Sequence, residues 1–245
     1  MCFTITLKSD LKKAEKRFKA KFAEPKNIIP IFYSSAFTLP SHPVILNNDP
    51  SSIILAKWGL IPHWIKDAEF AEKIRKQTFN SRAETIFVKP TFRNQIKQKR
   101  CMVIVDGFFE WREFKGKKYP YYIFMKNEEP FAFAGIWDEW IAPDSGEIIK
   151  TFSVITCDAN DLLSKIHNTK KRMPVILDKQ DEEKWLNNGL DKADIEKLLK
   201  PYKENDLEAY TVSKMITQRG VEKNTPEILK PFDYPELNSK IGMNN

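Results

Sequence analysis

Four strand-like segments follow one another closely in the middle of the chain, and this block constrains the fold more than any other feature. The segments are apolar or alternate between apolar and polar residues, with glycine, proline or charged residues between them, at residues 100–109, 119–125, 131–137 and 150–156. Helical patterns lie before and after the block. A central cluster of strands with helices on both sides favours an α+β fold over alternating βαβ units.

Shorter elements are predicted on both sides of this block. Before it, the pattern predicts a strand at 3–7, a helix over 11–22 capped by Ser9 or Asp10, an irregular proline-rich stretch over 25–50 with at most one short strand, a strand at 51–58 and a helix at 67–77. After it, the pattern predicts a helix capped by Asp158 that runs to Ile166, a strand at 174–177, helices at 180–186 and 191–199, and a strand at 207–212. No long linker divides these elements, so we expect one domain over residues 1–235 and a C-terminal tail over residues 236–245.

Composition narrows the class of protein. Hydrophobic residues at 42% and charged residues at 30% are ordinary globular values and argue against disorder. No apolar run approaches the roughly 18 residues of a membrane span, and the N-terminus lacks the pattern of a signal peptide. Three cysteines, at positions 2, 101 and 157, match neither a disulfide framework nor a zinc site. We therefore expect a cytoplasmic protein with no membrane association, and its formal net charge of +7 weakly favours a polyanionic partner.

Cys2 is the residue with the most distinctive chemistry. Methionine is normally removed before a small second residue, so the mature chain would begin with cysteine. Its α-amine and thiol, with reference pKa values of about 8 and 8.5, can capture an aldehyde as a Schiff base and then close a five-membered thiazolidine. Judged by position alone, the simpler interpretation is a small apolar residue that begins a strand.

Four other polar residues each allow two interpretations. Asn80 and Arg82 suit either a surface turn or a site in which the amide holds a backbone or amine group and the guanidinium binds a phosphate. Glu110 lies between aromatic residues, where burial would raise its pKa and favour proton transfer, or it faces water on an edge strand. His167 is either a cap at the end of a helix or an acid–base group.

Aromatic and basic residues give a weaker indication of nucleic-acid binding. Trp58 is predicted to lie in the core, whereas Trp64 in the following loop suits an exposed platform for bases. The basic run over residues 89–100 is either a solvated face or a surface that follows phosphates. His42 and His63 have no acidic residue nearby in the sequence, and we interpret both as structural.

Six motifs, in this order along the chain, resemble those of the SOS response-associated peptidase (SRAP) family, also described as abasic-site processing proteins. They span residue 1 to about residue 177, at residues 1–2, 58–62, 80–85, 106–111, 133–137 and 166–174. The resemblance implies a single α+β domain built around a strongly bent, mostly antiparallel β-sheet with flanking helices. It also implies a basic groove and no need for a metal or organic cofactor.

The function that the resemblance implies is covalent crosslinking to abasic sites in single-stranded DNA. After removal of Met1, Cys2 would capture the open-chain aldehyde as a thiazolidine and shield the lesion. Asn80 would position the amine, Glu110 would act as general acid and base, and His167 would assist protonation of the sugar oxygen. The DNA contacts implied in the same way are Arg82, Trp64, Pro40 and Thr156. We expect the protein to act as a monomer.

The sequence departs from the family pattern at two places. Members often begin Met-Cys-Gly-Arg, whereas Phe3 and Thr4 follow Cys2 here, so a basic DNA contact at position 4 is absent. Residues 168–171 also lengthen the loop between His167 and the Arg-Met-Pro segment.

Two other functions stay open at this point. Cys2 with Glu110 or His167 would suit a cysteine peptidase that removes the chain's own N-terminus. The net charge and the loop aromatics would also suit a non-catalytic module that binds single-stranded DNA or RNA. Strand cleavage by β-elimination, a lyase activity, is a variant of the main hypothesis, because a Schiff base that fails to cyclise would catalyse it.

Overall fold

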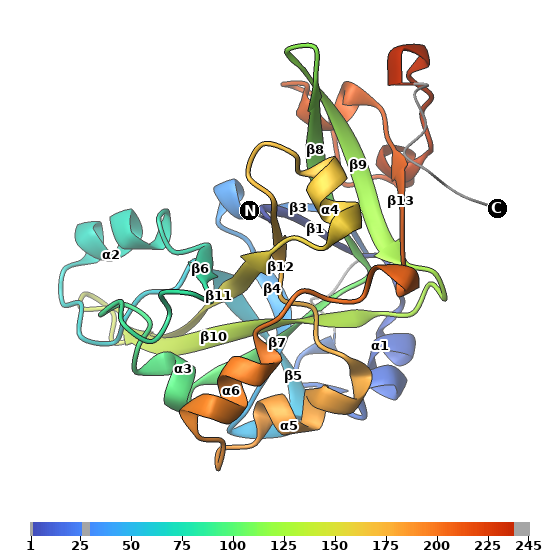
Figure 1. Cartoon of the computed structure of the whole chain (residues 1–245). Coiled ribbons are helices and arrows are strands. Elements are labelled where there is room, and N and C mark those ends of the chain that lie inside the picture. The colour runs from blue at the N-terminus through green and yellow to red at the C-terminus, as the bar shows by residue number, and fades with distance from the viewer. Residues whose placement is uncertain (1, 26–29, 238–245) are drawn as a thin grey trace.

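The computed structural model describes residues 2–25 and 30–237, which form an α+β domain with two β-sheets (Figure 1). The smaller sheet has five strands, and the pairings between them are antiparallel. In spatial order they are β13 (Leu207–Thr211), β9 (Lys117–Met125), β8 (Gly107–Phe114), β1 (Thr4–Leu7) and β3 (Ile31–Ser35). The N-terminal strand β1 therefore lies between two other strands of this sheet.

The larger sheet closes on itself. In spatial order its main path runs through β12 (Arg172–Pro174), β11 (Ile148–Asp158), β10 (Phe131–Ile141), β7 (Arg100–Val105), β4 (Ser41–Leu46), β5 (Asp49–Trp58) and β2 (Lys21–Phe22). Strand β11 also pairs with β5 in parallel, through Thr151 with Lys57 and Phe152 with Trp58, so five strands form a ring. The short strand β6 (Asn80–Arg82) is added to β11, also in parallel. The prediction of an α+β fold with a bent, mostly antiparallel sheet is confirmed.

The chain passes from one sheet to the other at Asp106, where the sequence pattern predicted one continuous strand. Asp106 separates β7 in the closed sheet from β8 in the smaller sheet. Its carboxylate accepts hydrogen bonds from the backbone N–H of Ser9 at 2.6 Å and from the Ser9 hydroxyl at 2.8 Å. This corner therefore ties the segment after β1 to the start of β8, the strand that carries Glu110.

Gly107, the first residue of β8, has no room for a side chain. A Cβ atom there would lie 2.4 Å from the hydroxyl oxygen of Tyr122 and 2.5 Å from its ring, and Tyr122 is buried. We expect Gly107→Ala to lower the free energy of unfolding by about 2–3 kcal/mol, since overpacking a filled core costs about this much. Thermal denaturation measures the effect as a fall in Tm of about 2–4 °C per kcal/mol.

The matched control for this prediction is Gly189→Ala. The nearest atom to a Cβ at Gly189 is the amide oxygen of Asn187 at 3.3 Å, on an exposed side chain that can shift. A Gly107→Ala variant as stable as this control would show that the Tyr122 ring moves aside without cost.

Two predictions in the N-terminal part were wrong. Helix α1 (Leu11–Phe18), capped by Asp10, ends at Lys19 in the left-handed region at φ 53°, so Phe22 lies in β2 and not on the helix. The proline-rich stretch contains two strands, β3 and β4, instead of one at most. Pro43 is tolerated inside β4 because the pairing with β7 begins only at Val44.

Four other helices match the predicted positions within a few residues: α2 (Ala68–Arg75), α4 (Asp161–Ile166), α5 (Glu182–Leu186) and α6 (Lys192–Leu198). The short helix α3 (Gln95–Gln98) was not predicted. The predicted cap of α4 was wrong: the side chain of Asn160 accepts from the N–H of Leu163, while Asp158 ends β11 and pairs with Arg172. The strand predicted at 174–177 is shifted to β12.

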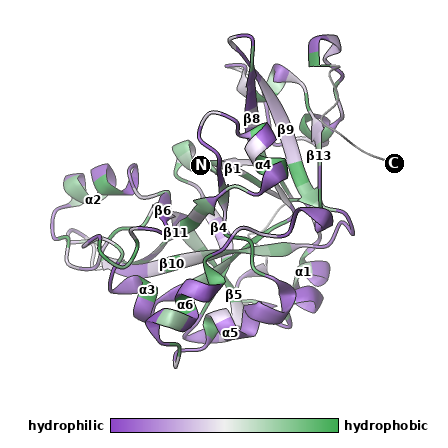
Figure 2. Cartoon of the chain, in the orientation of Figure 1, coloured by the Kyte–Doolittle hydropathy of each residue, from purple (hydrophilic) through white to green (hydrophobic). Residues whose placement is uncertain are grey.

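Hydrophobic residues follow the strands, and several helices are largely hydrophilic (Figure 2). Helix α1 is an example, because only Ala14 and Phe18 of its residues are buried. No helix within residues 2–25 and 30–237 is long and apolar enough to cross a membrane. The tail predicted over 236–245 lies outside the described residues except for Glu236 and Leu237, so its boundary stays a prediction.

Candidate active site

Cys2 lies buried immediately before β1, and a side chain from another sheet holds its backbone. The amide Nδ2 of Asn80 donates a hydrogen bond to the carbonyl oxygen of Cys2 at 2.9 Å. Asn80 begins β6 and pairs with Val154 of β11, so the closed sheet fixes its position. Asn80 therefore contacts the backbone of Cys2, while its predicted role in positioning the amine stays a prediction.

Glu110 reaches the same place from β8. The pairing of β1 with β8 joins Ile5 to Phe108 and Thr6 to Gly107, and continuing this register places Glu110 beside the residues that precede β1. Burial raises the pKa of Glu110 to about 7. Burial also raises the pKa of the Cys2 thiol, and the nearby Glu110 carboxylate adds to the effect. The thiol is therefore neutral, and the carboxyl group titrates near neutral pH.

His167 completes the group at the end of α4, the helix that lies against β8 (Figure 1). Its Nδ1 lies 2.9 Å from the carbonyl oxygen of Arg172 and 3.7 Å from Oε2 of Glu110. Burial lowers the pKa of His167 to about 4, so the ring is neutral near pH 7. A neutral ring that donates from Nδ1 to the carbonyl carries its basic nitrogen at Nε2.

The longer loop after His167 is fastened to the strand that carries Glu110. The side-chain amide of Asn168 donates to the carbonyl of Glu113 at 2.8 Å, and its oxygen accepts from the Glu113 N–H at 3.0 Å. Lys171, in the left-handed region at φ 49°, returns the chain to β12. The additional residues therefore leave His167 beside Glu110.

Arg172 positions His167 and was quoted in the sequence only as part of a motif. Its guanidinium binds the carboxylates of Glu84 and Asp158 and the carbonyl of Thr156, and it is largely buried. These contacts hold the backbone carbonyl that accepts from His167. The sequence could have indicated this role only through the place of Arg172 five residues after His167. The acidic partners of Arg172 are distant in sequence or on other elements, so no local pattern joins them to it.

The four predicted DNA contacts differ in exposure. Arg82, at the end of β6, is exposed, and its guanidinium makes no hydrogen bond or ion pair with the part of the chain that the structure describes. Trp64 is 48% exposed and Pro40 is partly buried. Thr156 is fully buried, and its hydroxyl donates to the carbonyl of Ser81 at 3.3 Å. Because Thr156 is buried, its predicted phosphate contact receives no support, whereas Arg82 and Trp64 are accessible.

A profile of the SOS response associated peptidase (SRAP) family matches residues 1–219, which include Cys2, Asn80, Glu110 and His167. The chain belongs to the SOS response associated peptidase family. The resemblance in the sequence motifs is thereby confirmed.

Relatives in the SRAP family align with most of the chain. The chain is 37% identical to abasic site processing protein YoqW of Bacillus subtilis over 94% of this chain and 99% of that protein. It is 33% identical to abasic site processing protein HMCES of Gallus gallus, over 72% of this chain and 56% of that protein. A solved structure from Bacteroides thetaiotaomicron, 40% identical, covers 94% of this chain and 100% of its own with a TM-score of 0.88.

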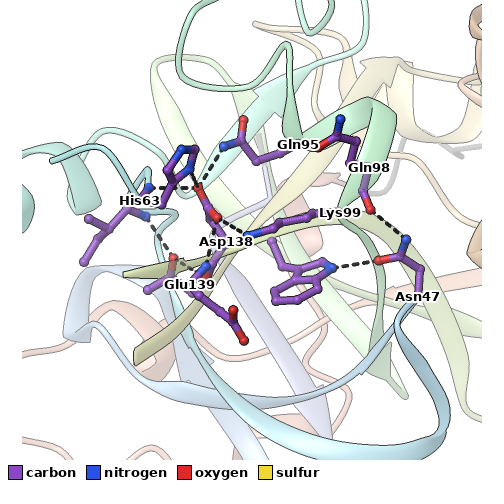
Figure 3. Close-up of polar contacts among 10 residues, drawn as sticks. Asn47, His63, Gln95, Gln98, Lys99, Asp138 and Glu139 are labelled. Carbon is purple, nitrogen blue, oxygen red and sulfur yellow. Dashed lines mark hydrogen bonds and ion pairs between the residues drawn. The ribbon is translucent and has the colours of Figure 1, made fainter. Parts of the chain in front are cut away.

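The loop that carries Trp64 in this SRAP chain is held by a buried carboxylate (Figure 3). Asp138 of β10 accepts from the backbone N–H of His63 at 2.9 Å and lies 3.0 Å from His63 Nδ1. It also accepts from Gln95 at 2.8 Å and from Lys99 at 2.7 Å. His63 therefore has an acidic partner that its sequence neighbours do not reveal, and its contact fixes the loop before Trp64.

The environment of His42 is that of a structural residue, in agreement with the interpretation from the sequence. It is fully buried with Nε2 2.6 Å from the carbonyl oxygen of Ile104, and burial lowers its pKa to about 4. Within residues 2–25 and 30–237, no group of three or more His, Cys, Asp or Glu residues could hold a metal ion.

Proposed function

We propose that the protein captures abasic sites in single-stranded DNA by forming a thiazolidine between Cys2 and the C1′ aldehyde of the deoxyribose. The observation that carries this proposal is the placement of the chain's second residue near Asn80 and Glu110, with Nδ1 of His167 3.7 Å from Oε2 of Glu110. Relatives that cover nearly the whole chain are named abasic site processing proteins, which supports the same substrate.

The reaction needs only the two functional groups of an N-terminal cysteine. Removal of Met1 converts the amide nitrogen of Cys2 into an amine. This nitrogen adds to the aldehyde carbon, and loss of one water forms the imine. The thiol sulfur then adds to the imine carbon, and its proton passes to the nitrogen. The products are a five-membered ring and one water, with no change of oxidation state.

Glu110 and His167 supply the proton transfers. An abasic deoxyribose is mostly a closed hemiacetal, so the ring oxygen must gain a proton and the C1′ hydroxyl must lose one before the aldehyde forms. Glu110, whose pKa burial raises to about 7, exists in both protonation states near neutral pH. The neutral ring of His167 carries its basic nitrogen at Nε2, so it accepts the proton of the C1′ hydroxyl while protonated Glu110 donates to the ring oxygen, and the Asn80 amide positions Cys2 through its carbonyl.

Accessible residues support DNA as the partner. Arg82 lies two residues after Asn80 and offers an exposed guanidinium to a phosphate. Trp64 is half exposed, and Pro40 begins the segment that leads into β4. The formal net charge of +7 adds long-range attraction for a polyanion. We propose that the protein acts as a monomer on DNA in the cytoplasm.

The peptidase alternative receives less support from the site. A cysteine peptidase attacks with a thiolate, whereas burial raises the pKa of the Cys2 thiol. Such a thiol suits a slower intramolecular addition to an imine that is held beside it. A simple binding module would not need a buried glutamate and histidine in contact.

The test is incubation of the purified protein with single-stranded DNA that carries one abasic site, followed by denaturing electrophoresis. We expect a shifted band that survives heat and denaturant, with a mass equal to the Met1-free chain plus DNA minus one water. The control is the same oligonucleotide after borohydride reduction, which converts the aldehyde into an alcohol and should give no band. Absence of the band with Met1 shown to be removed would overturn the proposal.

A further inference from the structure

The loop between β5 and α2 presents two exposed side chains on a fixed backbone. The side chain of His63 is 56% exposed and Trp64 is 48% exposed, whereas Ile61 and Ile65 on either side are buried. Three hydrogen bonds to β10 and β11 hold the loop: the N–H of Ile61 donates to the Thr151 hydroxyl at 2.9 Å, the N–H of His63 to Asp138 at 2.9 Å, and the indole N–H of Trp140 to the carbonyl of Ile65 at 2.7 Å. A fixed loop lowers the entropy cost of binding a ligand.

Asp138 determines which nitrogen of His63 is available to a ligand. Its side chain is completely buried, and its Oδ2 lies 3.0 Å from Nδ1 of His63 (Figure 3). Burial by itself would raise the pKa of Asp138, but hydrogen bonds from Lys99, His63 and Gln95 outweigh burial and lower it. An ionised carboxylate can only accept, so Nδ1 carries the hydrogen. The basic nitrogen is therefore Nε2, which makes no hydrogen bond with the described part of the chain.

Lys99 balances the charge of Asp138 before His63 takes up a proton. Its Nζ lies 2.7 Å from Oδ1 of Asp138, on the other oxygen of the same carboxylate. A histidine paired with a lone aspartate would form a neutral ion pair on protonation. Here the second cation is already present, so a proton on Nε2 of His63 leaves the group of three with one net positive charge at the surface.

The other charged side chains around His63 do not cancel this charge. Lys66 and Asp67 follow on the same segment, both are exposed, and Asp67 accepts from the N–H of Phe70 as the cap of α2. Glu139 donates its backbone N–H to Asp138, and its side chain points away from the imidazole (Figure 3). Among the described residues, Asp138 is the acidic side chain that pairs with His63.

The start of this loop is joined to the segment that leads into Asn80. The indole N–H of Trp58 donates to the carbonyl of Phe79 at 2.9 Å, and the hydroxyl of Thr78 donates to the carbonyl of Leu60 at 2.7 Å. Asn80 in turn holds the backbone of Cys2. The loop therefore has a fixed place relative to the site where the lesion is proposed to bind.

We infer that His63 is a DNA-binding residue whose Nε2 takes up a proton from solvent and donates it in a hydrogen bond to a backbone phosphate beside Trp64. This inference rests on the proposed function, because it requires single-stranded DNA to lie along this loop. An imidazolium is a cation and a donor at once, and a phosphate oxygen accepts such a bond strongly. Imidazole changes charge between about pH 5 and 8, so this contact strengthens as the pH falls through that range.

The experiment measures binding without crosslinking, at about pH 6 and about pH 8.5. The probe is a fluorescent single strand with one tetrahydrofuran residue, an abasic analogue that cannot form an aldehyde, and anisotropy gives Kd at several salt concentrations. At the lower pH, His63→Gln should raise Kd about fivefold, because it removes one hydrogen bond between charged groups at an exposed position. The slope of log Kd against log salt concentration should fall by about 0.7, the value for one phosphate contact on a single strand.

At the higher pH, His63→Gln should bind as wild type does, because the imidazole is neutral there and glutamine still offers Asp138 an N–H donor. Comparison of the two proteins at each pH cancels the titration of Glu110, which both share. An unchanged Kd at the lower pH would overturn the inference. A loss of equal size at both pH values would also overturn it, since it would show that the ring only supports the loop.

The matched control is Lys16→Gln, which also removes one positive charge. Lys16 is an exposed residue of α1, and α1 and α2 lie on opposite sides of the molecule (Figure 1). We expect a change in Kd below about twofold that is the same at both pH values, because a distant exposed charge is screened by salt. A control that reproduces the effect of His63→Gln would assign that effect to net charge and contradict a contact at His63.

Crosslinking to a true abasic site separates this inference from the proposed function. At saturating DNA, His63→Gln should reach the same adduct yield as wild type, because His63 binds phosphate and not the aldehyde. If Kd depends on His63 at the lower pH but wild type forms no adduct, the inference stands and the proposed function fails. If the adduct forms and His63→Gln leaves Kd unchanged, the inference fails and the proposed function stands.

Discussion

A Cys2→Ala variant is expected to form no adduct that survives denaturation. Alanine retains the N-terminal amine, so an imine can still form, but without sulfur the ring cannot close and water reverses the imine. We expect the adduct yield on denaturing electrophoresis to fall at least about 100-fold. This factor corresponds to about 2.8 kcal/mol in the equilibrium that holds the adduct, at about 1.4 kcal/mol for each tenfold change. Borohydride added during the reaction should restore a band, because it reduces the imine to a stable amine.

The matched control for this prediction is Cys157→Ala. Cys157 is a buried cysteine of β11, distant from the N-terminus in sequence, and the proposed chemistry assigns it no part. This variant should form the wild-type amount of adduct. A Cys2→Ala variant that crosslinks as well as this control without borohydride would show that another nucleophile captures the DNA.

Glu110→Gln is expected to slow crosslinking by about 10²–10⁴-fold, the usual contribution of a general acid or base. Glutamine retains the shape and burial of the side chain but cannot exchange a proton. In the reactive state, the Glu110 carboxyl and the α-amine must together hold one proton. Burial raises the pKa of the carboxyl to about 7, and the reference pKa of the amine is about 8. The wild-type rate should therefore reach a maximum between about pH 7 and 8. In the variant only the amine titrates, so the rate should rise with pH and level off.

Stability measurements show whether such a loss arises from misfolding. Burial raises the pKa of Glu110 from 4.5 to about 7, so the folded protein binds this proton more tightly than the unfolded chain does. The stabilisation is complete below pH 4.5 and is lost as the pH rises through about 7. Glutamine cannot ionise, so Glu110→Gln should melt at a higher temperature than wild type at pH 9 and at a similar temperature at pH 5. A Tm below that of wild type at both pH values would attribute the lost rate to damaged packing.

The elements that sequence patterns predicted are those whose signals are local. The alternating strands of the central block and the capped helix after Asp191 depend on neighbouring residues, and the structure contains them. Strands β3 and β4 were missed because prolines at 30, 40 and 43 resemble a loop, while pairing with β1, β5 and β7 stabilises them as strands. Strand β6 was missed because it is polar and only three residues long, and β11 holds it.

The residues of the candidate site also include some that the sequence indicated and some that it did not. The position of Cys2 allowed the hypothesis of aminothiol chemistry, because the reactivity of an amine and a thiol on adjacent carbons is a covalent property, but position alone favoured a small apolar residue at the start of a strand. The partnership of His63 with Asp138, separated by 75 residues, could not be predicted from the sequence, since no local pattern joins them.

By itself the sequence determined the α+β class, the family motifs in their order and a cysteine at position 2. Only the tertiary structure decided that Glu110 titrates near neutral pH, that His167 is neutral beside it and that Asn80 holds Cys2. The physical reason is that pKa values and hydrogen bonds depend on burial and on distances between residues. Those distances are set when strands from distant parts of the chain pair, and two sheets meet at this site.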